Sequence, residues 1–149
     1  MKSMFNPSDN NEIIQRVNKL APDATAQWGK MNAAQMLAHS KTPLKVAFGE
    51  LKLKRSLMGI LFGKIARKKL TSGKPFGRNL PTDKNFVVND QRNFEQEKKE
   101  LIALIQRFAK SGPTGITKER HPFFGVMSAQ EWDTLTWTHF DHHLRQFGV

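Results

Sequence analysis

Apolar residues recur three or four positions apart, the spacing of a helix, in five stretches of the chain. In the clearest stretch, Phe94, Leu101, Ile105 and Phe108 share one side of a helix whose other positions are mostly polar. No stretch alternates as a half-buried β-strand would. We expect helices at residues 10–21, 32–49, 53–70, 90–110 and 129–147. This pattern predicts an all-α protein, an up-and-down four-helix bundle with an additional basic helix over 53–70.

Local sequence signals support several of these boundaries. Asn32 is a good N-cap for the second helix, and Ser128 with Glu131 forms a capping box before the last one. The first helix is expected to follow Ser8 or Asp9. Residues 71–88 are rich in Gly, Pro, Asn and Lys, which predicts a long connection over the surface.

The 53–70 helix is expected to bury its apolar residues and to leave its basic residues in solvent. The expected core residues are Leu57, Ile60, Leu61 and Ile65. Gly59 and Gly63 lie four residues apart in a stretch, 57–63, that is apolar nearly all round. Such a stretch can lie in a membrane interface or can let two helices approach closely. We favour packing inside the bundle or at a dimer contact.

Length and composition limit the class of protein. A chain of 149 residues has the size of one domain, so we treat 1–149 as a single domain. Cysteine is absent, which excludes disulfides and thiolate ligands, so any metal must be bound by His, Asp or Glu. The amino terminus is polar, and no apolar run reaches the roughly 20 residues that span a bilayer. We expect a cytoplasmic protein with no membrane span.

The charge is strongly positive and unevenly distributed. Lys and Arg number 24 against 13 Asp and Glu, for a formal net charge of +11. Ten basic residues and one acid, Glu50, fall between Lys45 and Arg78, so this basic 45–78 region carries a formal +9. Such a region attracts anions, whether nucleic acid, a membrane surface or a small acidic metabolite.

Three of the five histidines have the spacing of a metal site. On the last helix, His139 and His143 lie about 40° apart around the axis, with Cβ atoms roughly 5–6 Å apart. His39 lies on the second helix, which also has an apolar face. Three imidazoles from two facing helices give the open, three-ligand geometry of a catalytic zinc site. A surface pair or a hydrogen-bonded core pair remains the alternative on spacing alone.

Two segments, 28–40 (WGKMNAAQMLAHS) and 121–149 (HPFFGVMSAQEWDTLTWTHFDHHLRQFGV), resemble the DinB-like superfamily, also called YfiT-like metal-dependent enzymes. The resemblance rests most specifically on His39 and on a carboxyl-terminal H-x-x-x-H followed by Gln, here His139, His143 and Gln146. It implies a four-helix bundle, often dimeric, whose three histidines bind a divalent ion. Some members transfer or isomerise low-molecular-weight thiols. The last helix lacks the H-E-x-x-H glutamate of metalloproteases, which argues against peptide hydrolysis by that route.

Further residues are candidates for the surroundings of the ligands. Those expected beside the ligands or in the adjoining pocket are Gln35, Trp132, His142 and Gln146. Trp28 and Trp137 are pocket candidates whose alternative is core packing, and Asp133 and Asp141 are carboxylates that could orient an imidazole, the alternative being helix-surface charge. The 121–125 loop (HPFFG) either plugs the bundle end or covers the site, and we favour the plug.

The sequence supports two hypotheses about function. The favoured one is a metal-dependent thiol transferase or hydrolase that acts on a small anionic substrate. His39, His139 and His143 would hold zinc, nickel, iron or copper, and the nucleophile would be metal-bound water or thiol, with no organic cofactor. Metal affinity should fall as the pH drops through the histidine range near ~6.5. The alternative is a non-enzymatic protein whose basic 45–78 region binds nucleic acid or an acidic surface. Nucleic acid ranks second because no recognisable nucleic-acid motif is present.

Overall fold

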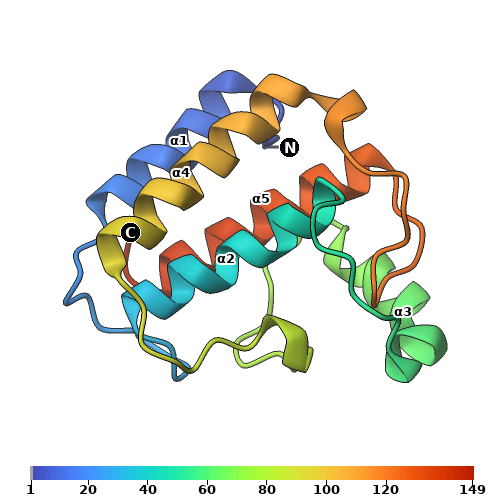
Figure 1. The fold of residues 1–149 in the computed structure, drawn as a ribbon, viewed down its shortest axis with the longest axis horizontal. Coiled ribbons are helices and arrows are strands. Elements are labelled where there is room, and N and C mark those ends of the chain that lie inside the picture. Colours follow the sequence, from blue (N-terminus) through green and yellow to red (C-terminus); the bar gives the residue numbers. More distant parts are fainter. Residues whose placement is uncertain (1) are drawn as a thin grey trace.

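The computed structural model describes residues 2–149 and is all-helical over that range, with no β-strand (Figure 1). Its α-helices are α1 (Pro7–Lys19), α2 (Ala33–Ala47), α3 (Leu57–Leu70), α4 (Phe94–Ser111) and α5 (Ala129–Gln146). Two short 3-10 turns, η1 (Lys84–Phe86) and η2 (Pro113–Gly115), lie in the connections. The five helices predicted from periodicity are confirmed, with ends that differ by a few residues.

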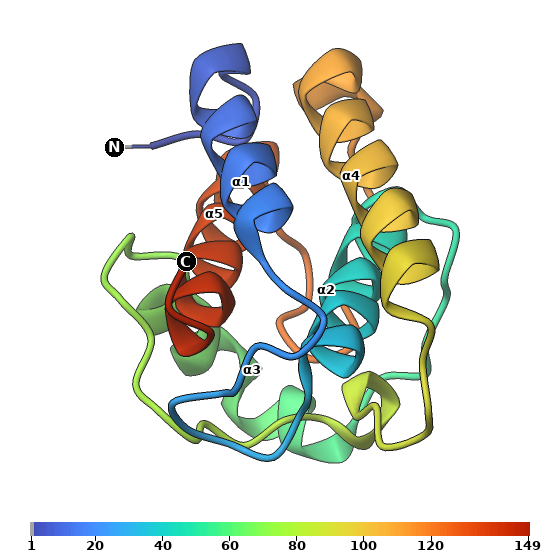
Figure 2. The same cartoon turned by 90° about the vertical axis from the view of Figure 1, so that its left-hand side faces the viewer.

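Four of the helices pack around one core. α2 contacts α4 and α5, and α1 also contacts α4 and α5. Viewed nearly end-on, α1 and α4 form one layer and α5 and α2 the next, with α3 beyond the second layer (Figure 2). The largest side chains buried between the four include Leu101, Ile105, Phe108, Trp132 and Phe140, each at most 1% exposed.

Side-chain caps determine where the helices begin. α1 starts earlier than predicted, because the Asn6 side chain accepts hydrogen bonds from the backbone N–H groups of Ser8 and Asp9, and Pro7 occupies the first turn. The expectation of an N-cap at Ser8 or Asp9 is therefore wrong. The N-cap at Asn32 and the capping box at Ser128 are confirmed, and Asn32 also forms a capping box with Gln35.

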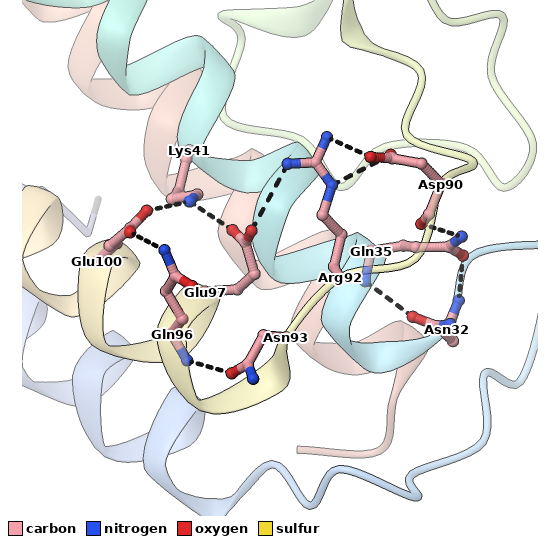
Figure 3. A network of polar contacts seen from close by, with 9 residues as sticks. All are labelled: Asn32, Gln35, Lys41, Asp90, Arg92, Asn93, Gln96, Glu97 and Glu100. Atoms are coloured by element: carbon pink, nitrogen blue, oxygen red, sulfur yellow. Dashed lines mark hydrogen bonds and ion pairs between the residues drawn. The ribbon is translucent and has the colours of Figure 1, made fainter.

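A buried ion pair joins α2 to α4 (Figure 3). Lys41, 7% exposed, pairs with Glu97, 6% exposed, and with Glu100. Burial alone lowers the pKa of Lys41, but hydrogen bonds to Glu100 and Glu97 outweigh it and hold that pKa above its usual value. Arg92 also contacts Glu97, with 3.6 Å between Nη1 and the carboxylate. This polar link was not predicted.

α3 differs from the expectation for the 53–70 helix. The side chains predicted for the core, Leu57, Ile60, Leu61 and Ile65, are between 54% and 72% exposed. The buried residues of α3 are Gly59 and Gly63, which lie against the backbone of Phe123. A Cβ on Gly63 would overlap the Phe123 carbonyl oxygen, so only glycine permits this close approach. The glycine face turns inward, and the opposite, apolar face is left outside.

Among the described residues, none of the helices has both the length and the hydropathy that crossing a bilayer requires. The 71–88 segment runs as a connection, as predicted, and contains one turn of 3-10 helix, η1. Together with α3, this connection lies on the side of α2 and α5 that faces away from α1 and α4 (Figure 2).

Candidate metal centre

Three imidazoles meet between α2 and α5. His39 comes from α2, and His139 and His143 stand one turn apart on α5. One ring nitrogen from each lies within 4.8 Å of the other two. Nε2 of His39 is 3.1 Å from Nε2 of His139, and the His39 and His143 ring centroids are 4.8 Å apart. Two nitrogens on one tetrahedral zinc lie roughly 3.4 Å apart, so the closest pair has nearly that spacing.

Hydrogen bonds to the opposite ring nitrogens define which nitrogen is free. Nδ1 of His39 donates to the carbonyl oxygen of Phe86 over 2.7 Å. Nδ1 of His143 donates to the side-chain oxygen of Gln146 over 2.8 Å. Both acceptors lack a hydrogen, so each Nδ1 carries the proton and each Nε2 presents its lone pair. Two of the three imidazoles are thereby held in the form that binds a metal through Nε2.

Burial keeps these imidazoles neutral. It lowers the pKa of His39, and it lowers the pKa of His143 to about 3, with a further contribution from neighbouring His39. The pKa of His139 also falls well below its usual value because of burial and then because of the two other imidazoles. Neutral imidazole is the form that binds a metal. The cluster is therefore ready to accept a cation at neutral pH.

The cluster lines a cavity of about 2030 Å³. One wall consists of α2 and α5 with the three histidines, and the other consists of α3 and the 71–89 connection. The lining is mixed: apolar side chains such as Met58 and Phe62 alternate with basic ones such as Lys54 and Lys69. A cation bound by the imidazoles would be reached from this cavity, which is larger than the ~300–1,000 Å³ of a typical small-molecule site.

Gln146 and His142 both lie at the site, in different roles. Gln146 accepts from His143 and donates to the carbonyl oxygen of Trp28, so its amide orientation is fixed. His142 lines the cavity. Its ring centroid lies 5.5 Å from that of Trp28 and 5.8 Å from that of Phe76. Burial lowers its pKa also, against a raising effect from Asp141.

The remaining candidates serve the fold. Gln35 lines the cavity, but its side chain completes the capping box of α2 and donates to the carbonyl oxygen of Asp90. Trp132 is 1% exposed and lines the cavity from the core. Trp137 lies elsewhere, with Nζ of Lys2 5.8 Å from its ring.

The two carboxylates considered as orienting groups make no hydrogen bond to His39, His139 or His143 and are engaged by other groups. Asp133 is buried and accepts hydrogen bonds from the backbone N–H groups of Met4 and Phe5, which fastens the amino-terminal segment. Asp141 forms ion pairs with Arg16 and Arg145 near the surface. The alternative for both was a charge on the helix surface. Asp141 fits that alternative, whereas Asp133 is buried and does not.

The 121–125 loop forms part of the cavity wall. Nδ1 of His121 accepts hydrogen bonds from the backbone N–H groups of Phe123 and Phe124, and His121 and Gly125 pair through their backbones. Phe123 and Phe124 line the cavity, and the Phe123 backbone supports α3. Burial lowers the pKa of His121 to about 4. The loop therefore braces α3 beside the site.

One functional contact escaped sequence reasoning. The carbonyl of Phe86, in η1, holds the proton of His39 on Nδ1. Every residue has a carbonyl, so no residue type marks this one in the sequence.

A protein-family model described as "Protein of unknown function (DUF1569)" matches residues 2–148, nearly the whole chain. No curated protein and no solved structure matches it.

Proposed function

The chain belongs to the DUF1569 family, whose description names no activity, and we propose that His39, His139 and His143 bind a divalent metal ion. The observation that carries the proposal is the convergence of three neutral imidazoles that are buried or partly buried, two of which have their Nδ1 protons held by Phe86 and Gln146. Without a metal, the lone pair on Nε2 of His39 can accept only from Nε2–H of His139, 3.1 Å away, among the described hydrogen bonds of that atom. A divalent cation satisfies all three at once.

We further propose that the four packed helices correspond to the bundle of the DinB-like superfamily. The ligand positions support this, with one histidine on α2 and two on α5, one turn apart and followed by Gln146. The packing of α1, α2, α4 and α5 on one another is also what such a bundle requires.

The chemistry we propose is thiol transfer or hydrolysis on a small anionic substrate. When bound, a divalent ion with three imidazole ligands lowers the pKa of a bound water or thiol, which supplies the nucleophile at neutral pH. Among the described residues that line the cavity there is one carboxylate, Asp83, and no glutamate, which argues against a glutamate base. The three-histidine donor set suits zinc, nickel or iron.

The cavity walls support an anionic substrate with an apolar part. Lys54, Arg55 and Lys74 supply positive charge along the lining, and Phe62 and Phe76 supply apolar surface. Basic groups around a cleft raise the local concentration of an anion. A thiol-bearing acid of low molecular weight combines both features.

Calorimetric titration of zinc and of nickel into metal-free protein tests the proposal. His39→Ala, His139→Ala and His143→Ala should each abolish tight binding, because each removes one of three ligands. His142→Ala and His121→Ala are matched controls on the same cavity and should retain most of the affinity. Metal analysis of protein purified without an affinity tag identifies the native ion. Tight binding retained in any of the three ligand variants would refute the site.

A further inference from the structure

α3 carries an apolar face that none of the described residues 2–149 covers. Leu57, Leu61 and Ile65 follow one another at intervals of four residues and are 62% to 72% exposed. Phe62 and Met58 flank this line and are at least half exposed, and both line the cavity, as does Leu57 at the start of the line. Large apolar side chains that gather on one exposed helix mark an interaction surface. We call the surface formed by Leu57, Leu61 and Ile65 together with the neighbouring Lys64 and Lys68 the α3 face.

Positive charge borders the apolar line. Lys64 and Lys68, both exposed, lie one turn apart beside Leu61 and Ile65. From residue 51 to residue 82 the sequence holds nine Lys and Arg and no Asp or Glu. Among the described residues, no carboxylate forms an ion pair with Lys64, Lys68 or Lys69. The face therefore combines apolar side chains with lysines whose charges are free.

The combination of apolar side chains and free lysines distinguishes between the kinds of partner that could bind the α3 face. Nucleic acid would pair with the lysines but would leave Leu57, Leu61 and Ile65 against phosphates and water. A second copy, in a symmetric dimer through this face, would bring two sets of free lysines together. An anionic lipid surface satisfies both components, because acyl chains take the apolar line while lysines extend to the head groups.

We propose that the α3 face docks the protein on the surface of an anionic phospholipid bilayer. The helix lies in the interface, with Leu57, Leu61 and Ile65 inserted and Lys64 and Lys68 at the head groups. Because α3 also forms one wall of the cavity, docking brings the cavity next to the lipid surface. The proposal does not rest on the proposed metal site.

Vesicle sedimentation tests the charge requirement. The protein should bind phosphatidylcholine vesicles that contain about 30 mol % phosphatidylglycerol, should bind pure phosphatidylcholine far more weakly, and should be released by salt. Lys64→Gln with Lys68→Gln should weaken binding about tenfold or more. Lys19→Gln with Lys110→Gln on α1 and α4 removes the same charge from exposed positions elsewhere and should bind like the natural protein.

Two further variants test insertion. Leu61→Gln with Ile65→Gln should weaken vesicle binding about tenfold or more, whereas Leu61→Val with Ile65→Val should retain most of it. Because the chain has no cysteine, Leu61→Cys accepts a single environment-sensitive fluorophore. Its emission should shift to the blue on anionic vesicles, and the same label at Lys110→Cys should not respond.

Three results would overturn the proposal. The first is equal binding to neutral and anionic vesicles. The second is vesicle binding unchanged by the Leu61 and Ile65 glutamine variant, which would mean plain attraction to polyanions, nucleic acid included. The third is a dimer in sedimentation that this variant dissociates, without vesicle binding, which would assign the face to a second copy. Circular dichroism and zinc titration of each variant verify folding, so failure of docking is distinguished from failure of the metal site.

Discussion

Nδ1 of His143 donates a hydrogen bond to Oε1 of Gln146, three residues further along α5, over 2.8 Å. The amide of Gln146 is itself oriented, because its nitrogen donates to the carbonyl oxygen of Trp28. Gln146 therefore fixes the proton of His143 on Nδ1 and leaves Nε2 for a metal. We regard it as a positioning residue.

Removing this hydrogen bond should weaken metal binding without removing a ligand. Gln146→Leu should lower zinc affinity about 10–100-fold, the usual effect of losing a group that orients a ligand. Gln146→Glu keeps an acceptor and should retain more of the affinity. Calorimetric titration measures both, with Gln106→Leu at an exposed position of α4 as the control. An affinity unaffected by Gln146→Leu would show that His143 needs no such support.

The pH dependence of metal binding should differ from that of exposed histidines. Three ligands with an ordinary pKa near ~6.5 would lose roughly 1,000-fold in affinity between about pH 7.5 and about pH 5.5, because each would take up a proton. Burial lowers the pKa of His39 and His139 and brings that of His143 to about 3. Protons therefore compete with the metal only at lower pH. The fall in metal affinity expected from the sequence near pH ~6.5 is accordingly moved to lower pH. Titrations at the two pH values should agree within about tenfold, and a loss near 1,000-fold would contradict the lowered pKa values.

The Lys41–Glu97 pair should be costly to break from one side. Lys41→Met leaves the Glu97 carboxylate buried beside α2 without its main partner and should lower the free energy of unfolding by about 3–5 kcal/mol. The double variant Lys41→Met with Glu97→Leu should recover much of that loss. Urea denaturation measures the series, and Lys45→Met, exposed one turn further along α2, is the control. Additive single and double effects would mean that the two groups do not interact.

The glycine face of α3 should tolerate no added methyl group. A Cβ at position 63 would overlap the carbonyl oxygen of Phe123, so Gly63→Ala should detach α3 locally at a cost of about 1–3 kcal/mol. Hydrogen exchange should show lost protection in α3 and unchanged protection in α4. Gly77→Ala, where an added Cβ finds ordinary contacts, serves as the control. Full protection of α3 in Gly63→Ala would show that its contact with the loop adapts.

Local chemistry made much of the fold predictable. The caps at Asn32 and Ser128 and the one-turn spacing of His139 and His143 depend on residues close in sequence, and the structure agrees with them. The presence of a partner for Lys41 could also have been predicted. Lys41 falls between Leu37 and Leu44 on the buried stripe of α2, a position where a charge needs a partner.

Other features depend on tertiary contacts that periodicity does not report. An apolar stripe shows that a helix has an apolar face but not that another element covers it, which is why Leu61 and Ile65 were misplaced. The close glycine contact with Phe123 decides the orientation of α3, and the sequence names the glycines but not their partner. The convergence of His39 with the α5 pair was predicted, whereas its Phe86 acceptor was not.

Phe86 joins the histidine cluster to α3 through a short series of contacts. Its carbonyl accepts from His39, and its ring stacks on the ring of His121, with centroids 6.3 Å apart. His121 in turn holds the backbone of Phe123, against which Gly63 packs. If a ligand that shifts α3 changes the metal affinity by some factor, thermodynamic reciprocity requires the metal to change the affinity of that ligand by the same factor. Binding of a ligand to the outer helix and binding of a metal to the inner imidazoles are then thermodynamically linked.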